Sequence, residues 1–366
     1  MKRIVHIVGG LGSGGTESML YKILKYSDRS KYYHEVISLT DEGTIGEKIR
    51  NEGFKVHTLN ISYKNLIPSL FKAKRICADF DLISTWLYHS DLFGFLVAKI
   101  LLKKKLLWNV RHSNLDKNSN KARTLKIVKI NSWLSKYVDA ITYNSEQAFK
   151  NHLLFGFKNE KSSILPNGFE LDKFKFDKNS RFEIRRELNI DLDEKVIITV
   201  GRWNIQKDYH TLFKSLYKLN ENKESYKMLM VGANLDESNT ELTSLMEKFN
   251  LKDRVLLLGR RDDIPALLSA ADVYVSSSLG ESFSNSIGEA MACELTCVVT
   301  DVGESKALVG DTGYVVSAKD YLGMAEALAD ALKNIKADRN VKARKRILEE
   351  YDIKSVVKKY EEKFSY

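Results

Sequence analysis

The sequence is poor in cysteine and proline. Its 366 residues include three prolines and three cysteines, Cys77, Cys293 and Cys297. An odd number of cysteines without metal-ligand spacing argues against a disulfide scaffold and favours reduced thiols in a cytosolic protein. Low-complexity stretches and Gly/Ser linkers are also missing. We therefore expect a compact, well-connected chain.

Long hydrophobic runs are missing as well. The apolar run Ile4–Val8 stops at Gly9, too early for the core of a signal peptide. The longest apolar segment, Leu92–Leu102, contains Lys99 and is shorter than the roughly 18–20 residues that span a bilayer. We expect a cytoplasmic protein that does not cross a membrane.

The composition is that of a globular protein. Hydrophobic residues make up 43% of the chain and charged residues 29%. A chain of this length can form two domains, each with its own core.

Positive charge is concentrated in the first half. Residues 1–167 carry 27 Lys+Arg against 14 Asp+Glu, whereas residues 168–366 carry 31 against 34. Such a field favours an anionic partner, such as a membrane surface, a phosphorylated substrate or nucleic acid. No nucleic-acid module or interleaved aromatic groove accompanies it, so we predict no nucleic-acid partner.

Short β-rich runs alternate with helical patterns along the chain. The predicted strands are 3–8, 35–39, 55–59, 81–84, 106–110 and 140–143, then 196–200, 228–231, 255–258, 273–276, 297–300 and 314–316. Two βα series predict two doubly wound α/β domains, separated at the turn Leu165-Pro166-Asn167-Gly168. We place the domains at 1–167 and 168–350. The helix predicted at Ile353–Phe364, within 351–366, fits neither series.

A glycine-rich loop follows the first strand. Gly10, Gly12 and Gly15 match G-x-G-x-x-G, with Gly14 in the same loop and Asp41 after the second strand. This pattern is compatible with an NAD(P)-dependent oxidoreductase, but the motif alone is weak evidence. The same glycines allow any phosphate or sugar to approach the backbone and the helix N-terminus.

Two cations follow the first strand of the second half. Arg202 and Lys207 lie around a short loop that starts at Gly201. A planar guanidinium and a compact ammonium suit a diphosphate, whose charge they would neutralise as it leaves.

Two glutamates flank a helix start after strand 273–276. Glu281 lies in a polar loop, and Glu289 lies in a helix that we expect to begin near Ser284. A ligand at the start of that helix would meet both carboxylates together with backbone N–H groups. We therefore predict that the segment from Glu281 to Glu289 binds a ligand with sugars on either side of phosphates.

Two smaller motifs have opposite interpretations. His112 follows strand 106–110 at the end of the sheet where ligands bind, so it is a candidate for contact with a sugar hydroxyl or for steering an acceptor. Asp79-Phe80-Asp81 is a D-x-D sequence, but it lies where a strand begins. We interpret it as structural and predict no essential metal.

Taken in order, these motifs resemble glycosyltransferase family 4, a family of retaining enzymes with the two-domain GT-B fold. The resemblance rests on Gly9-Gly10 through Glu17, His112, the Pro166-Asn167-Gly168 turn, Gly201-Arg202 with Lys207, Glu281 through Cys293, and Val298 through Gly303. It implies two Rossmann-like domains that face a central cleft. It also implies that the last helix crosses back to the N-terminal, acceptor-binding domain.

The resemblance assigns roles to individual residues. Arg202 and Lys207 would bind the diphosphate of a nucleotide-sugar, Glu289 the ribose, Glu281 the transferred sugar, and His112 a nearby sugar hydroxyl. The loop and helix start would complete the donor site through Gly10, Gly12, Gly14, Gly15, Ser282, Phe283, Ser284 and Asn285. Ser282 and Ser284 replace the family's usual glycine and proline, and Glu294 replaces a helix-ending glycine. The serines can still cap the helix.

The implied function is transfer of a hexosyl or N-acetylhexosaminyl group with retention, as in bacterial surface-polysaccharide synthesis. A UDP-sugar is favoured over a GDP-sugar as donor, and the acceptor is expected to be a lipid-linked glycan. Two alternatives stay open, the oxidoreductase that uses Gly10–Gly15 and a non-catalytic nucleotide-sugar-binding protein.

The predicted helix 121–137 offers a surface for a membrane. Lys126, Lys129, Trp133 and Lys136 lie about a quarter-turn from the face expected toward the core, which comprises Ile127, Ile130, Leu134 and Tyr137. Lysines with a tryptophan suit an anionic bilayer, and the clusters Lys103–Lys105 and Lys72–Arg75 would add to them. We expect peripheral contact with the inner face of the plasma membrane.

Overall fold

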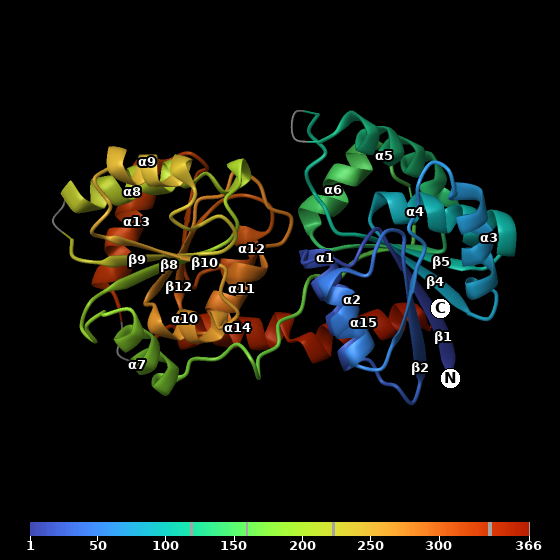
Figure 1. The fold of residues 1–366 in the computed structure, drawn as a ribbon, viewed down its shortest axis with the longest axis horizontal. Helices are drawn as coiled ribbons and strands as arrows, with labels where there is room; N and C mark the ends of the chain where they lie inside the picture. The colour runs from blue at the N-terminus through green and yellow to red at the C-terminus, as the bar shows by residue number, and fades with distance from the viewer. Residues whose placement is uncertain (118–119, 159, 222–223, 336–338, 366) are drawn as a thin grey trace. The chain divides into compact units, whose positions relative to one another are not determined.

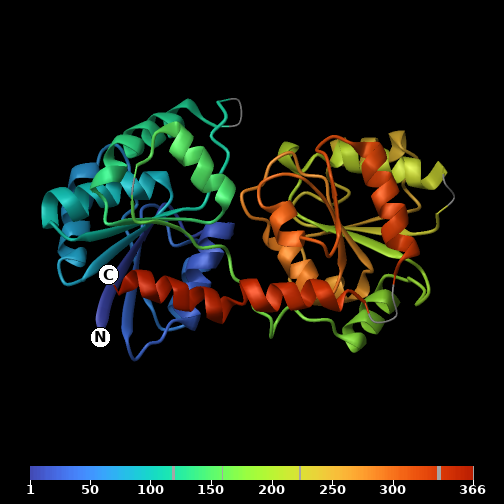
Figure 2. The same cartoon turned by 180° about the vertical axis from the view of Figure 1, so that it is seen from behind.

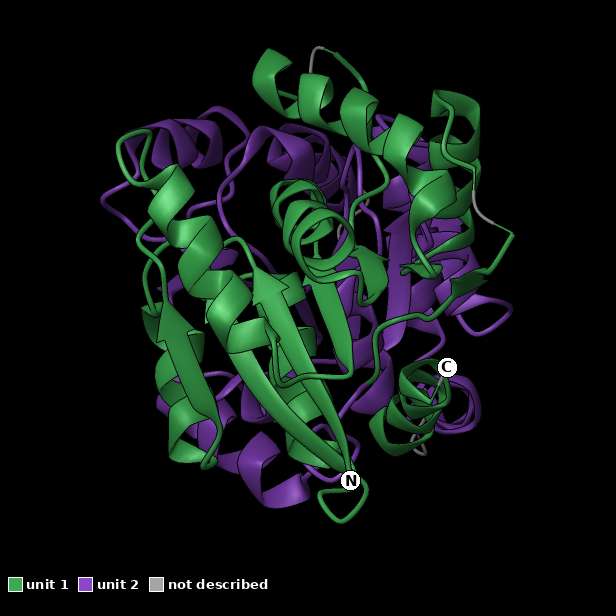
Figure 3. Cartoon of the chain, turned by 90° about the vertical axis from the view of Figure 1, so that its right-hand side faces the viewer, with its two compact units in different colours: residues 1–168, 353–366 green, residues 169–352 purple. Residues whose placement is uncertain are grey.

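The chain forms two compact units in a computed structural model (Figure 3). Unit 1 contains residues 1–168 and 353–366, and unit 2 contains residues 169–352. The structure describes residues 1–117, 120–158, 160–221, 224–335 and 339–365. The boundaries at Gly168/Phe169 and Asp352/Ile353 lie within two residues of the domain limits expected from the sequence.

Unit 1 is built on a parallel sheet of seven strands in the order β3-β2-β1-β4-β5-β6-β7 (Figure 1). The strands are β1 (Lys2–Val8), β2 (Tyr32–Ser38), β3 (Lys55–Thr58), β4 (Leu82–Trp86), β5 (Lys105–Val110), β6 (Ala140–Tyr143) and β7 (Ser162–Ile164). The helices are α1 (Gly15–Tyr26), α2 (Gly43–Asn51), α3 (Leu66–Cys77), α4 (Tyr88–Phe95), the π-helical η1 (Leu96–Leu102), α5 (Ala122–Leu134), the 3₁₀ turn η2 (Ser135–Tyr137), α6 (Glu146–Phe155) and α15 (Ile353–Phe364).

Unit 2 repeats this plan with six parallel strands in the order β10-β9-β8-β11-β12-β13. Its strands are β8 (Val196–Val200), β9 (Lys227–Val231), β10 (Val255–Gly259), β11 (Val273–Ser276), β12 (Thr296–Thr300) and β13 (Tyr314–Val316). Its helices are α7 (Lys178–Glu187), the 3₁₀ turn η3 (Ile205–Lys207), α8 (Tyr209–Glu221), α9 (Thr240–Lys248), α10 (Ile264–Ala270), α11 (Asn285–Ala292), α12 (Ser305–Val309), α13 (Tyr321–Lys333) and α14 (Val341–Tyr351).

The predicted strands are all confirmed, with ends that shift by a few residues. Alternating side chains explain why the signal was clear: Ile4 and Val8 of β1 enter one apolar cluster, whereas Val5 and Ile7 enter the cluster on the other face of the sheet. Strand β7 was missed because its three residues include two serines. The doubly wound α/β fold is confirmed.

Helix α15 packs on unit 1, and its bounds are those predicted (Figure 2). Its apolar residues Val356, Val357 and Tyr360 share a core cluster with β1 and α1. The Tyr360 hydroxyl is also 2.7 Å from the guanidinium of buried Arg111, which in turn donates to the Leu165 carbonyl at 2.9 Å. Arg111 therefore ties the last helix to the segment that leaves β7.

Two buried histidines lie between the sheet and α15. His6 Nε2 is 3.0 Å from His34 Nδ1, and His34 Nε2 is 3.0 Å from the Ser27 hydroxyl, which donates to Glu361 of α15 at 2.9 Å. Burial lowers the pKa of His34 to about 4, with a smaller effect from Arg29, and lowers the pKa of His6 well below its usual value. Both imidazoles are therefore neutral in the folded protein at neutral pH.

Acid is expected to destabilise unit 1 through this pair. Unfolded histidines titrate near pH ~6.5, so the unfolded state binds more protons than the folded state as the pH falls from there toward the folded pKa. Each histidine should cost about 1.4 kcal/mol of stability per pH unit in that window. Urea unfolding at several values between pH 7 and pH 4.5 measures the slope.

The variant His34→Gln should flatten that slope, and exposed His210 provides the matched control variant His210→Gln. Equal slopes for the wild type and His34→Gln would contradict the assignment.

The strand order reverses direction once in each sheet. In unit 1 the neighbours β1 and β4 are not consecutive, and in unit 2 the same holds for β8 and β11. Ligands of doubly wound folds bind beyond the carboxyl ends of the strands at such a switch point. The loops that follow these four strands are therefore the places to look for a site.

No helix within the described ranges is both long and apolar enough to span a bilayer. The longest apolar segment of the sequence instead forms the end of α4 and the π-helix η1.

Candidate functional site

The predicted cations and one predicted acid lie at the switch point of unit 2. The loop Gly201–Asp208 follows β8, and the loop Ser277–Ser284 follows β11, its neighbour in the sheet. Two hydrogen bonds join the loops, since the Leu279 N–H donates to the Gln206 carbonyl at 2.7 Å and the Ser277 hydroxyl donates to the Lys207 carbonyl at 2.7 Å. The two loops therefore form one support.

Lys207 and Glu281 meet on this support. Lys207 Nζ is 2.5 Å from Glu281 Oε1, and the Ser278 hydroxyl donates to the same oxygen at 3.0 Å. The two side chains are 23% and 16% exposed, so the ion pair is partly shielded from water and yet reachable. A cation suited to phosphate and a carboxylate suited to a hydroxyl are thus in direct contact.

Arg202 lies differently from Lys207. Its side chain is exposed and takes part in no ion pair among the described residues, while its carbonyl lies 3.4 Å from the Tyr209 hydroxyl. The next residue, Trp203, stacks on Tyr209 with a ring separation of 5.3 Å. The loop is therefore anchored on Tyr209 at Arg202 and Trp203, and the guanidinium remains available to a ligand.

Helix α11 begins with Asn285, after the N-cap residue Ser284, which confirms the expected start. The expected cap is wrong, because the Ser284 hydroxyl makes no bond to the helix backbone and lies 3.3 Å from the Ser286 hydroxyl instead. The Ser284 side chain therefore does not occupy the N–H groups of the first turn. Glu289 lies one turn further along the helix and is half-buried.

The remaining predicted donor residues differ in exposure. Ser282 and Asn285 are half-buried, whereas the Phe283 ring is buried and stacks on Phe169 at 6.1 Å. Phe283 therefore belongs to the core of unit 2, and only its backbone is placed to meet a ligand. At the end of α11, Glu294 adopts a positive φ of 65°, so the turn forms without the glycine.

Gly303, which lies shortly after β12, occupies a position that does not accommodate a side chain. Its φ is +55°, and a Cβ built on it would lie 2.1 Å from the Glu281 carbonyl oxygen. The backbone after β12 thus packs directly behind the loop that carries Glu281. Any larger residue would displace one of the two segments.

In unit 1 the predicted residues lie after β1 and β5. The glycine loop opens α1, with Gly14 as its N-cap, and a Cβ on Gly12 would meet no atom within 4 Å, so the loop backbone is open at that point. His112 follows β5 and is half-buried, and burial lowers its pKa, opposed by hydrogen bonds with Asn114 and Asn120. Asp41 is exposed beyond β2.

Asp79-Phe80-Asp81 has the structural place expected for it. The Asp81 carboxylate accepts from the Arg3 backbone N–H at 2.8 Å, at the amino end of β4. Within the described ranges, no three His, Cys, Asp or Glu side chains are grouped closely enough to hold a metal ion.

The surface of α5 differs in part from the expectation. Lys126, Lys129 and Lys136 are exposed as predicted, and Trp133 is 65% exposed. Ile130 and Tyr137 were expected in the core but are also exposed. The reason is that Asn131 occupies the buried face, where its side chain donates to the Tyr88 carbonyl at 2.9 Å, which a hydrophobic pattern does not foresee.

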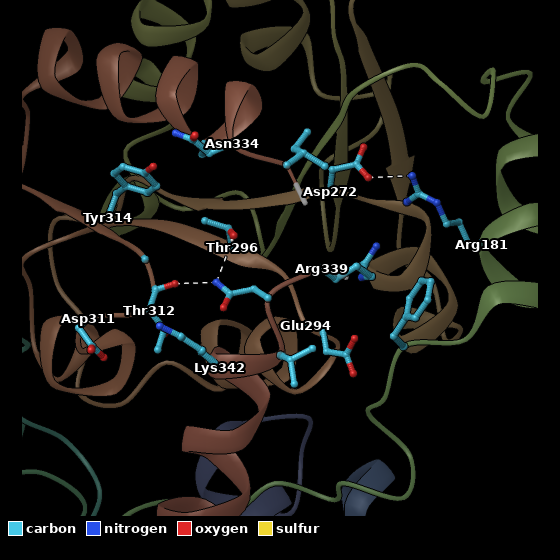
Figure 4. Close-up of a pocket in the computed structure, with 16 residues that line it drawn as sticks. Arg181, Asp272, Glu294, Thr296, Asp311, Thr312, Tyr314, Asn334, Arg339 and Lys342 are labelled. Atoms are coloured by element: carbon cyan, nitrogen blue, oxygen red, sulfur yellow. Dashed lines mark hydrogen bonds and ion pairs between the residues drawn. The ribbon is translucent and has the colours of Figure 1, made fainter. Parts of the chain in front are cut away.

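A cavity of unit 2 lies elsewhere (Figure 4). It measures about 1010 Å³ and is lined by residues at the amino ends of β11, β12 and β13, such as Asp272, Thr296 and Tyr314. Its arginines bind the protein itself: Arg181 pairs with Asp272, and Arg339 donates to the carbonyls of Ala271 and Cys293. We interpret this cavity as a structural groove, away from the switch point.

Sequence reasoning missed two contributors to these sites. Ser278 supports Glu281, and Tyr88 follows β4 at the switch point of unit 1. Tyr88 could be found only from the strand order, because β4 becomes a neighbour of β1 only in the folded sheet.

Comparison with known proteins gives the same assignment for both halves. Residues 13–173 match the family described as Glycosyltransferase Family 4, and residues 180–348 match the family described as Glycosyl transferases group 1. The structure of Anabaena HepE in complex with UDP superposes with a TM-score of 0.87 at 21% identity, covering 100% of each chain. At this identity the likeness establishes the fold, which is GT-B.

Two relatives illustrate the range of similar sequences. The N-acetyl-alpha-D-glucosaminyl L-malate synthase of Bacillus anthracis is 28% identical over 52% of this chain and 50% of its own length. The match thus spans about half of that relative. The N-acetylgalactosamine-N,N'-diacetylbacillosaminyl-diphospho-undecaprenol 4-alpha-N-acetylgalactosaminyltransferase of Campylobacter jejuni is 22% identical over 92% of each chain.

Proposed function

The chain belongs to the GT-B glycosyltransferases of the family 4 and group 1 type, and we propose that it transfers a hexosyl or N-acetylhexosaminyl group from a nucleotide diphosphate sugar with retention. The observation that carries this proposal is the Lys207–Glu281 pair at the switch point of unit 2. The family assignment removes the reason to read Gly10–Gly15 as the cofactor loop of an oxidoreductase.

In the proposed donor site, Lys207, Arg202 and the first turn of α11 stabilise the diphosphate. These groups supply positive charge and N–H donors where negative charge develops as the sugar leaves. Glu289 binds the ribose hydroxyls, and Glu281 holds the sugar beside the phosphate. The Lys207–Glu281 contact of 2.5 Å supports this division, since the phosphate and the sugar are adjacent in the donor.

The proposed reaction exchanges two bonds at the anomeric carbon. The bond from this carbon to the phosphate oxygen breaks, and a bond to the acceptor oxygen forms on the same face. The leaving phosphate oxygen takes the acceptor proton, so no protein nucleophile is required. His112 of unit 1 is assigned a hydrogen bond to a sugar hydroxyl. The anomeric configuration of the product, read by NMR, tests retention.

We favour a UDP-sugar as the donor, which the UDP named in the HepE complex supports. A thermal-shift panel of UDP- and GDP-sugars identifies the base and the sugar. The bound donor should raise the melting temperature of the wild type and should do so much less for Arg202→Ala and Glu289→Ala. Full stabilisation of both variants would overturn the site assignment.

Turnover separates an enzyme from a non-catalytic binding protein. Slow hydrolysis or transfer of the stabilising donor supports an enzyme, whereas binding without turnover supports the alternative. The site neutralises the diphosphate with side chains, so the proposal needs no essential metal. Activity should therefore survive EDTA, and loss of activity that Mg²⁺ or Mn²⁺ restores would reject this part.

We propose a lipid-linked glycan as the acceptor, reached at an anionic membrane surface. The diphospho-undecaprenol acceptor in the name of the Campylobacter jejuni relative supports this choice. The exposed Trp133 among Lys126, Lys129 and Lys136 supports contact with such a membrane surface. Because the proposed acceptor is a lipid-linked glycan, we assign the enzyme to surface-polysaccharide synthesis.

Liposome co-sedimentation tests the membrane contact. The wild type should bind vesicles that contain anionic lipid and should bind neutral vesicles less. Replacing the three lysines and Trp133 by alanine should reduce binding, whereas the exposed ion-pair variant Lys218→Ala in unit 2 should not. Equal binding to both vesicle types, or none, rejects the contact.

A further inference from the structure

Tyr88 lies at the switch point of unit 1. Val8 is opposite Trp86 in the register of β1 and β4, so Leu87 and Tyr88 leave the sheet at the same level as the glycine loop. Tyr88 begins α4 and is almost fully buried. The next strand, β5, leads to His112. Tyr88 is thus placed beside two loops assigned to the reaction.

The Tyr88 hydroxyl is held by a hydrogen bond of defined direction. It lies 3.0 Å from His152 Nε2, while His152 Nδ1 lies 2.7 Å from the Ala148 carbonyl. A carbonyl only accepts, so Nδ1 carries the hydrogen and, in a neutral imidazole, Nε2 accepts from the tyrosine. Burial lowers the pKa of His152 to about 4, opposed by the hydrogen bond to the Ala148 carbonyl and aided by the nearby His112. The imidazole is therefore neutral, as the bond requires.

The Tyr88 ring links this bond to His112. The two rings meet edge to face, with centroids 6.4 Å apart and planes at 82°. The Tyr88 ring also stacks on His152, with centroids 5.8 Å apart. His112 therefore has an aromatic wall beside it whose orientation is set by a buried hydrogen bond.

The backbone at Tyr88 is also constrained. Leu87 has φ 69° and ψ 165°, a region that side chains other than glycine rarely adopt, and its N–H donates to the Asn109 carbonyl at 3.1 Å. The buried Asn131 side chain donates to the Tyr88 carbonyl at 2.9 Å. A strained Leu87 held by one hydrogen bond, followed by a Tyr88 held by another, indicates that the position of Tyr88 matters beyond packing.

We propose that Tyr88 and His152 are positioning residues that hold the His112 imidazole in the orientation in which it meets the sugar. The inference rests on the role that the proposed function gives to His112. Asp91 and Tyr143, both buried, and the adjacent His89 are further titratable groups near Tyr88. Among the described residues, the Tyr88 hydroxyl has its hydrogen bond with His152 and none with these three groups.

Tyr88→Phe tests the proposal because it keeps the ring and removes the bond to His152. Turnover of the donor found in the thermal-shift panel should fall about tenfold in kcat, with KM within about twofold, since a small misplacement near the reacting centre lowers the rate. His152→Asn should cause a similar loss from the other side of the bond. The exposed Tyr137→Phe is the matched control and should change nothing.

A spectroscopic signature and a double-mutant cycle separate positioning from general destabilisation. The chain has seven histidines, so ring ¹⁵N spectra can be assigned with His112→Gln, and Tyr88→Phe should move the titration of His112. In the His112→Gln background, Tyr88→Phe should have no further effect on kcat, whereas a purely structural role would add its loss to that of His112→Gln.

The outcomes distinguish the inference from its premise. If His112→Gln turns over like the wild type, the role of His112 is rejected and the inference falls with it. If His112→Gln is slow but Tyr88→Phe and His152→Asn are as fast as the wild type, the inference alone is rejected.

Discussion

Lys207→Ala is expected to lower kcat for donor turnover by about 10²–10³-fold, the loss seen when one group that stabilises developing charge is removed. The substitution removes the compact cation 2.5 Å from Glu281 and leaves that carboxylate, which is 16% exposed, without this partner beside the phosphate. Two effects thus add in the same direction. Steady-state kinetics with the donor from the thermal-shift panel measures the loss.

Matched variants show whether the charge or the fold is responsible. Lys207→Arg keeps a positive charge and should retain more activity than the alanine variant. Lys218→Ala breaks an exposed ion pair with Glu221 on α8 and should leave turnover unchanged. If Lys207→Ala keeps activity within a factor of about two, the leaving-group role of Lys207 is wrong.

Gly303→Ala is expected to weaken the binding of UDP by about 10- to 100-fold without removing any polar group. Alanine is strained at φ +55°, and its Cβ would overlap the Glu281 carbonyl, which lies 2.1 Å away. Such overlaps cost about 1–3 kcal/mol in packed structures, and the left-handed backbone costs about 1 kcal/mol more. The loop with Glu281 has to move, which disturbs its contact with Lys207.

Gly53→Ala is the control for Gly303→Ala. Gly53 has φ +88°, yet a Cβ there would meet no atom within 4 Å, so this variant carries the backbone strain without the overlap. It should lose some stability and leave UDP binding unchanged. Calorimetric titration with UDP measures both variants. Wild-type affinity and melting temperature in Gly303→Ala would show that the loop after β12 does not support Glu281.

The predictions of local structure that were confirmed depended on local signals. Arg202 and Lys207 follow a strand whose five residues are apolar apart from Thr199. Helix α11 begins where a polar loop gives way to a helical pattern of apolar residues. In each case a few neighbouring residues carry the information, because strand and helix periods are properties of short segments.

The predictions that failed concern where polar side chains find their hydrogen-bond partners. The Ser284 hydroxyl was expected to cap α11 but lies near Ser286. Ile130 was expected in the core, yet Asn131 takes the buried face because the Tyr88 carbonyl is there to accept its hydrogen bond. A buried polar residue requires a partner, and the partner is 43 positions away in the chain.

The sequence by itself determined the two βα series, the approximate positions of their strands and the residue types available at each loop, because hydrophobic alternation and turn residues act locally. Only the tertiary structure decided which loops meet. Strand order makes β8 the neighbour of β11, which brings Lys207 to Glu281 across 74 positions. The adjacent strands β4, β5 and β6 likewise bring Tyr88, which follows β4, to His152, which follows β6, across 64 positions. The physical reason is that pairing between distant strands is selected by the packing of the whole sheet.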